Sequence, residues 1–212
     1  MTNIQAFIER RKAEEASRPR LIFALDATMS RQPTWDSAAE LQEQMFKAAG
    51  SGIDVQLVYY RGQECKASGW LCDPARLMSS MRKISCVSGY TQIERVLAHA
   101  LREADKHSIR ALVFVGDACE EDLAGLTEPA GSLGRKSVPV FMFQEGDDAS
   151  ATKAFREIAR LSNGICARFD VGSAAQLANL LRTVGRFATA GDGRLALSHA
   201  REALRQTTLL LE

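Results

Sequence analysis

The sequence has neither a long hydrophobic run nor a paired cysteine motif. No apolar stretch approaches the roughly 18 residues that a transmembrane helix needs, and the first twenty residues lack the apolar core of a secretory signal. The five cysteines are odd in number and show no C-x-x-C spacing, which disfavours both a disulfide framework and a zinc site. We therefore expect a cytoplasmic protein with reduced thiols and no membrane insertion.

An excess of charge of one sign is also missing. The chain carries 27 basic and 26 acidic side chains, for a formal net charge of +1. Bulk attraction to nucleic acid needs a strong basic excess, so we expect no nucleic-acid partner. No G-x-G-x-x-G fingerprint follows the first predicted strand, which disfavours a dinucleotide site. No pattern in the sequence indicates an oligomeric state.

The chain does have a regular alternation of apolar runs and helical segments. Its 212 residues, 46% of them hydrophobic, suit one domain with a sizeable core. The runs LIFAL and ALVFV are apolar throughout, as expected for strands buried on both faces of a parallel sheet. The pattern predicts an α/β fold with a doubly wound, mostly parallel central sheet and helices on both faces. The predicted strands are 21–25, 53–60, 64–71, 111–115, 138–143 and 164–170, and the predicted helices are 2–16, 34–49, 74–83, 91–107, 119–127, 150–162, 173–187 and 192–211.

Two aspartates end strands that should be neighbours. Asp26 directly follows the run 21–25, and Asp117 follows the run 111–115 after one glycine. In the common strand order 3-2-1-4-5-6, the first and fourth strands lie side by side, and ligands bind at their carboxyl ends. Two carboxylates placed there repel each other, which raises the pKa of one of them. A divalent cation between them removes that cost, so the pair favours a metal site.

Hydroxyl groups accompany the two aspartates. The loop D-A-T-M-S at residues 26–30 can present three oxygen ligands from one short segment, and a loop that ends in Gly-Tyr-Thr91 precedes the predicted helix 91–107. Hard oxygen ligands suit Mg²⁺ or Mn²⁺, with water in the remaining octahedral positions. The predicted metal ligands are Asp26, Thr28, Ser30, Thr91 and Asp117.

These three segments resemble the metal-ion-dependent adhesion site of von Willebrand factor A (VWA) domains. The order Asp26-x-Thr28-x-Ser30, then Thr91, then Asp117, and the spacing between the segments match the family's pattern. Thr28 replaces the serine that the family usually has, and its hydroxyl can still reach a metal. Alanine follows Asp117 where the family often has glycine. The residues after Ser30 are similar to a bacterial cytosolic branch of the family.

The resemblance implies a Rossmann-like VWA domain over residues 20–187, with helical extensions at 1–19 and 188–212. In this family a carboxylate from a partner completes the coordination of the metal. The resemblance therefore implies a non-enzymatic, Mg²⁺- or Mn²⁺-dependent interaction module, whose partner is another protein that donates an Asp or Glu. The absence of any His or Cys from the predicted site agrees with this interpretation.

Other interpretations remain open. Thr91 with Glu94, and Asp117 with Glu120, fit the spacing of a helix capping box, which would leave a metal-free scaffold domain. A Mg²⁺-dependent, phosphatase-like enzyme is a further alternative. Haloacid-dehalogenase phosphatases also have an aspartate after the first strand, but they need a second one two residues later, where this chain has Thr28.

Acidic residues should also lie along this edge of the sheet. Residues 111–134 contain five acidic and no basic side chains, and Glu145, Asp147 and Asp148 follow the strand at 138–143. We expect them to form an acidic rim that favours a partner with a neutral or basic surface.

Overall fold

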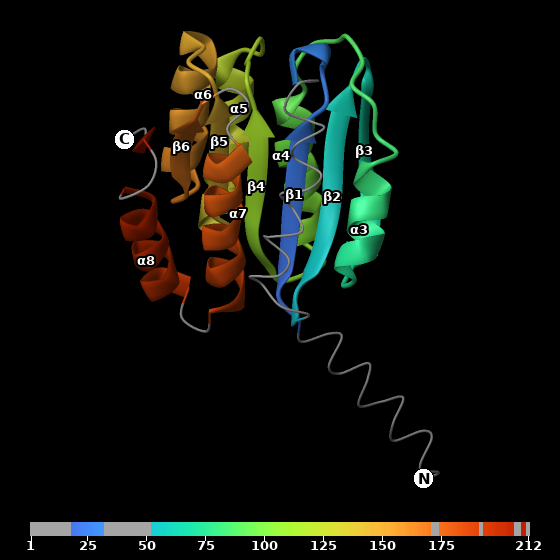
Figure 1. The fold of residues 1–212 in the computed structure, drawn as a ribbon. Helices are drawn as coiled ribbons and strands as arrows, with labels where there is room; N and C mark the ends of the chain where they lie inside the picture. Colours follow the sequence, from blue (N-terminus) through green and yellow to red (C-terminus); the bar gives the residue numbers. More distant parts are fainter. Residues whose placement is uncertain (1–17, 32–51, 171–173, 191–192, 206–208, 211–212) are drawn as a thin grey trace.

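The computed structural model describes residues 18–31, 52–170, 174–190, 193–205 and 209–210 (Figure 1). The predicted helices 2–16 and 34–49 lie outside the described residues.

The described strands are β1 (Arg20–Asp26), β2 (Asp54–Arg61), β3 (Glu64–Leu71), β4 (Ile109–Gly116), β5 (Val140–Glu145), β6 (Ile165–Phe169) and β7 (Leu209–Leu210). They form one sheet in the order β3-β2-β1-β4-β5-β6-β7. The five strands from β2 to β6 in this order run parallel, whereas β3 pairs with β2, and β7 with β6, in the antiparallel sense. The order confirms that the first and fourth strands are neighbours, with Leu25 opposite Val115 near their carboxyl ends.

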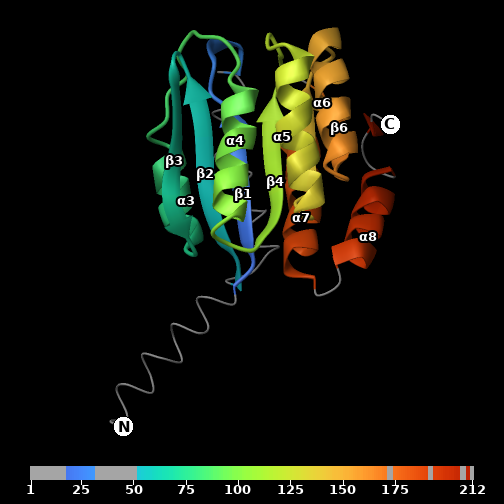
Figure 2. The same cartoon turned by 180° about the vertical axis from the view of Figure 1, so that it is seen from behind.

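Helices cover both faces of the sheet, which confirms the doubly wound α/β fold (Figures 1 and 2). One face carries α3 (Pro74–Met81), α7 (Ala174–Thr189) and α8 (Gly193–Arg205). The other face carries α4 (Ile93–Ala104), α5 (Leu123–Arg135) and α6 (Ala149–Leu161). None of the helices in the described part of the chain has the length and apolar character needed to span a bilayer.

The apolar run of β1 supplies both halves of the core. Leu21, Phe23 and Leu25 pack into the hydrophobic cluster under α3, α7 and α8. Ile22 and Ala24 pack into the cluster under α4, α5 and α6. Because successive side chains of a strand point to opposite faces, a strand between two helix layers must be apolar at every position.

The helix predicted at 119–127 differs from the structure. The segment before residue 123 is a loop, and α5 then continues to Arg135 through Pro129. Proline lacks the N–H that would bond the carbonyl four residues earlier, on Gly125. Gly125 is exposed, so water can satisfy that carbonyl. Burial of Pro129 and of its neighbours Leu126 and Ala130 stabilises the helix beyond the proline.

The end of the chain also differs from its prediction. The helix predicted at 192–211 ends at Arg205, and β7 adds a short antiparallel strand beside β6. Helix α8 contributes Ala196, Ala200 and Leu204 to the same hydrophobic cluster as α7. The domain boundaries at 19/20 and 187/188 stay predictions.

Candidate metal centre

The two predicted aspartates stand at adjacent strand ends on the upper edge of the sheet in Figure 1. Asp26 is the last residue of β1, and Asp117 follows the last residue of β4. A side chain at Gly116 would come within 2.7 Å of the Phe114 ring and 3.5 Å of the Asp26 Cβ atom. The glycine therefore leaves room for the Phe114 ring of its own strand, whereas the distance to Asp26 of the neighbouring strand is an ordinary van der Waals contact.

Asp26 is completely buried and held by two hydrogen bonds. The backbone N–H of Thr28 donates to Oδ1 at 2.8 Å, and the hydroxyl of Tyr60 donates to Oδ2 at 2.9 Å. Burial raises the pKa of Asp26, the two hydrogen bonds oppose that shift, and the charge of Asp117 adds to it. The carboxylate is thus fixed in orientation, but its negative charge is only partly compensated.

The loop after β1 gathers three of the predicted ligands. A single turn of 3₁₀ helix, η1 (Met29–Arg31), follows Thr28, whose carbonyl accepts a hydrogen bond from the Arg31 N–H at 3.1 Å. The turn places the hydroxyl oxygens of Thr28 and Ser30 3.1 Å apart. Asp26, Thr28 and Ser30 are therefore brought together.

Thr91 is linked to the loop that carries Asp117. Its hydroxyl accepts a hydrogen bond from the N–H of Glu120 at 3.0 Å, and its own N–H donates to the Glu120 carboxylate at 2.9 Å. A Cβ atom at Gly89 would come within 2.6 Å of the Gly62 backbone, so the Thr91 loop can pack against the β2–β3 turn only with glycine at position 89.

The capping boxes considered from the sequence are not formed. Helix α4 begins after Gln92, and its first N–H groups donate to the carboxylate of Glu121 instead, from Ile93 at 2.5 Å and from Glu94 at 2.8 Å. Helix α5 is capped by Asp122, not by Asp117. Neither Thr91 nor Asp117 is therefore accounted for by helix capping.

Asp117 has a buried carboxylate oxygen that stands out, because its Oδ1 atom has no hydrogen-bond partner among the described residues. A buried carboxylate oxygen without a partner is unfavourable, and a cation would satisfy it. In the described ranges, no group of three or more His, Cys, Asp or Glu side chains could hold a metal. Any metal here would depend on the hydroxyl oxygens of Thr28, Ser30 and Thr91 beside the two carboxylates, and this donor set fits a hard divalent cation.

Arg31 is the residue of this region that the sequence did not point to. Its side chain is fully buried and forms an ion pair with Glu145, which ends β5 and is 4% exposed. Burial lowers the pKa of Arg31, whereas the charges of Asp117 and Asp26 oppose that shift. A buried guanidinium thus shares the edge with three carboxylates. An arginine in a loop normally indicates a solvated side chain, so no sequence signal distinguishes it.

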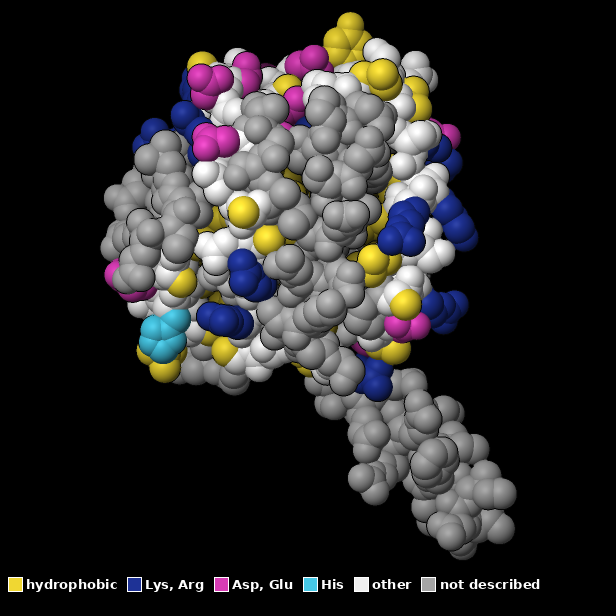
Figure 3. Space-filling view, in the orientation of Figure 1, with side chains coloured by type: hydrophobic (Ala, Val, Ile, Leu, Met, Phe, Trp, Pro, Cys, Tyr) yellow, Lys and Arg dark blue, Asp and Glu magenta, His cyan; other side chains and the backbone are white. Residues whose placement is uncertain are grey.

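The expected acidic rim is largely engaged within the fold. Glu145 is buried against Arg31, which overturns its assignment to the rim. Asp122 and Asp148 cap the first turns of α5 and α6, and Glu121 caps α4. Acidic side chains still gather along the upper edge of the face in Figure 3, beside hydrophobic ones.

Large apolar side chains are exposed around the same edge. Met29 is 53% exposed, Val87 42% and Tyr90 78%. They stand in the loops that carry Ser30 and Thr91. The hydrogen bond from the Val87 N–H to the Ala27 carbonyl, at 3.0 Å, links these two loops.

Comparison with solved structures decides the fold. A VWA-type protein from Catenulispora acidiphila superposes with a TM-score of 0.71 over 82% of this chain, at 20% sequence identity. The chain has the von Willebrand factor A fold. It corresponds to 43% of the length of that VWA protein. No family model and no curated protein matches the sequence.

Two further structures share the fold at low sequence identity. The superposition on the protein BatB from Bacteroides thetaiotaomicron covers 87% of this chain and 99% of BatB, with a TM-score of 0.63 at 16% sequence identity. The superposition on the von Willebrand factor domain of a type V pilus tip protein from Porphyromonas gingivalis covers 82% of this chain and 98% of that domain. The TM-score is 0.59 at 12% sequence identity. At these identities the similarity concerns the VWA fold.

Proposed function

We propose that this VWA domain is a protein-interaction module that holds Mg²⁺ or Mn²⁺ at the carboxyl edge of its sheet. Asp26, Thr28, Ser30, Thr91 and Asp117 would be the ligands. A cation bound there supplies an open coordination position that the carboxylate of a partner protein can fill. The partner would therefore donate an Asp or Glu.

The unsatisfied Oδ1 atom of Asp117 is the observation that carries this proposal. Asp26 is fixed by Thr28 and Tyr60, and Thr91 is tied to the loop of Asp117, so these proposed ligands are held by hydrogen bonds within the fold itself. Rigid positioning lowers the entropic cost of binding. A scaffold without a metal would leave the Oδ1 atom of Asp117 to the charge of Arg31 alone, with no direct hydrogen-bond partner among the described residues.

The exposed apolar side chains support a protein as the partner. Met29, Val87 and Tyr90 offer apolar contact area around the site. Aromatic residues and methionine are enriched in protein interfaces, and tyrosine is a frequent source of binding energy there. The partner's carboxylate would fix the register, and these side chains would supply much of the contact energy.

We expect no hydrolase activity, because the proposed role needs only binding. We also propose a cytoplasmic location, since none of the five cysteines forms a disulfide and reduced thiols persist in a reducing compartment.

Metal binding can be tested by thermal unfolding and calorimetry in Mg²⁺, Mn²⁺ and EDTA. A cation at a hundredfold excess over its Kd stabilises the folded state by about 2.7 kcal/mol, which for a domain of this size raises Tm by roughly 5–10 °C. Asp117→Asn should abolish the shift. The control Asp105→Asn, at the exposed end of α4, should keep it. Equal Tm values in EDTA and metal for the unmodified protein, with no heat of binding, would overturn the metal site.

The partner can be tested once it has been isolated on the immobilised protein. Chelation and Asp117→Asn should each release it. Tyr90→Ala should weaken the complex but leave the Mg²⁺-dependent Tm shift unchanged, since this exposed side chain is not a proposed ligand. A partner retained equally well in EDTA contacts another surface.

A further inference from the structure

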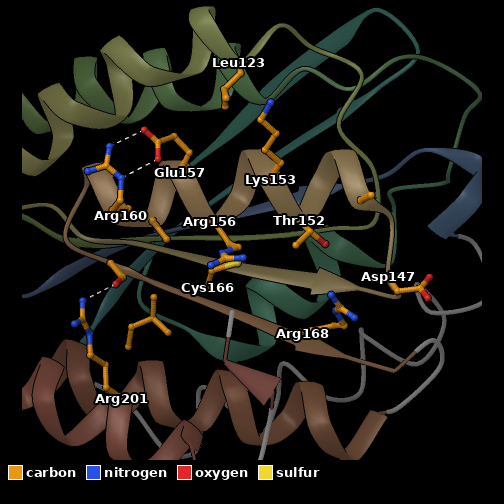
Figure 4. Close-up of a pocket in the computed structure, with 14 residues that line it drawn as sticks. Leu123, Asp147, Thr152, Lys153, Arg156, Glu157, Arg160, Cys166, Arg168 and Arg201 are labelled. Carbon is orange, nitrogen blue, oxygen red and sulfur yellow. Dashed lines mark hydrogen bonds and ion pairs between the residues drawn. The ribbon is translucent and has the colours of Figure 1, made fainter. Parts of the chain in front are cut away.

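A second candidate site, which contains none of the five proposed metal ligands, lies between α6 and β6. The structure has a groove of about 850 Å³ there (Figure 4). Its walls come from α6 and from Arg201 of α8, and its floor includes Cys166 on β6. Cavities of roughly 300–1,000 Å³ are the size range of small-molecule sites.

Positive charge is concentrated in this groove. Its lining contains five basic and two acidic side chains, although the chain as a whole is almost neutral. Glu157 is neutralised by Arg160, with two contacts at 2.7 and 2.8 Å. Lys153, Arg156 and Arg168 have no ion-pair partner among the residues that the structure describes.

Two of these guanidinium groups lie near the thiol of Cys166. Arg156 of α6 and Arg168 of β6 both act electrostatically on the thiol of Cys166, and Figure 4 shows Arg156 over that sulfur. Burial raises the pKa of Cys166 to about 12, so the thiol stays neutral and supplies no counter-charge. The Nε atom of Arg168 is buried, with no acceptor in the described part of the chain. Neighbouring cations without a counter-ion repel each other, and a bound anion would stabilise them.

The chemistry of the lining indicates what the anion would be. The planar fork of arginine matches the geometry of phosphate oxygens. Ala159, Cys166 and Leu123 add apolar surface beside the charges. A polyanion such as nucleic acid would need a basic stripe across the surface, whereas these charges line one cavity. We propose that the groove binds a small organic phosphate, with Arg156 and Arg168 on the phosphate and the organic part on the apolar floor.

The test is calorimetric titration at constant ionic strength with phenyl phosphate, inorganic phosphate and a phosphoserine peptide. Phenyl phosphate should bind more tightly than inorganic phosphate. Arg156→Gln changes an exposed side chain and should weaken the binding of phenyl phosphate about tenfold, because it removes one charge-assisted contact. The double variant with Arg168→Gln should weaken it further. The control Arg186→Gln, on the exposed side of α7, should change nothing.

Each remaining outcome overturns the inference. Phenyl phosphate that fails to bind, or that binds no better than inorganic phosphate, removes the organic phosphate as the ligand. A phosphoserine peptide that binds when phenyl phosphate does not makes the groove a protein-docking site. Equal weakening by Arg186→Gln shows that only general charge is sensed. Thermal melts of each variant confirm that it is folded.

Discussion

The buried pair of Arg31 and Glu145 gives the sharpest test of how this edge is held together. Removing one partner of a buried ion pair costs about 3–5 kcal/mol, because the other charge is left uncompensated in a medium of low dielectric. Arg31→Met keeps much of the side-chain volume but removes the buried cation that interacts with Glu145, Asp26 and Asp117. For a domain of this size, 1 kcal/mol corresponds to about 2–4 °C in Tm, so we expect Tm to fall by roughly 10 °C in EDTA.

A double-mutant cycle separates charge from packing. Adding Glu145→Gln to Arg31→Met should recover a large part of the loss, because no uncompensated charge then remains at that pair. The matched control is the exposed pair of Arg160 and Glu157, where Arg160→Met should cost no more than about 1 kcal/mol. Urea unfolding gives the free energies, and the m-values show whether the unfolding stays two-state.

The Arg31→Met variant also provides a test of the proposed metal site. Without Arg31 the edge carries one more uncompensated negative charge, so Mg²⁺ should raise the Tm of Arg31→Met by more than it raises that of the unmodified protein. Two results would refute this reasoning. One is an Arg31→Met protein as stable as the unmodified one in EDTA. The other is a double variant no more stable than Arg31→Met alone, which would show that the loss comes from packing.

Three other variants have definite expected outcomes. Asp26→Asn should unfold in EDTA at the same temperature as the unmodified protein or higher, because burial and Asp117 disfavour the charged form, and it should lose the Mg²⁺ response; a marked drop in Tm contradicts this. Glu121→Ala removes the acceptor for two N–H groups of α4 and should cost about 1–2 kcal/mol in urea unfolding, whereas Glu128→Ala on the exposed side of α5 should be near neutral. Burial lowers the pKa of His99 from 6.5, so the unfolded chain binds its proton more readily and stability should fall as pH drops below 6.5. His99→Gln should flatten that part of the pH profile, and an unchanged profile would exclude His99 as its source.

The strands follow closely from the sequence. The runs LIFAL and ALVFV are apolar at every position, and only a strand covered on both faces requires that pattern. The common strand order 3-2-1-4-5-6 then predicted Asp26 and Asp117 at neighbouring strand ends, and the observed order confirms that β1 and β4 are neighbours. Local sequence patterns predicted the structure less well where the burial of side chains opposes the intrinsic propensity of a residue. The proline at 129 predicts a break, yet the packing of Leu126 and Ala130 stabilises the helix through it.

The sequence by itself determined the α/β class and the loop that carries Asp26, Thr28 and Ser30. These features depend on periodicity and on residues close together in the chain, which a linear sequence displays directly. The adjacency of β1 and β4 was expected only from the common strand order of such folds, and the structure decided it. Only the tertiary structure decided that Arg31 is buried against Glu145, that Glu121 caps α4, and that α6, β6 and α8 enclose a basic groove. In each case the partners are distant in the chain, and the burial of a charge depends on which residues the fold brings around it. The same side chain could be solvated in another fold, so its role follows from its surroundings and not from its local sequence.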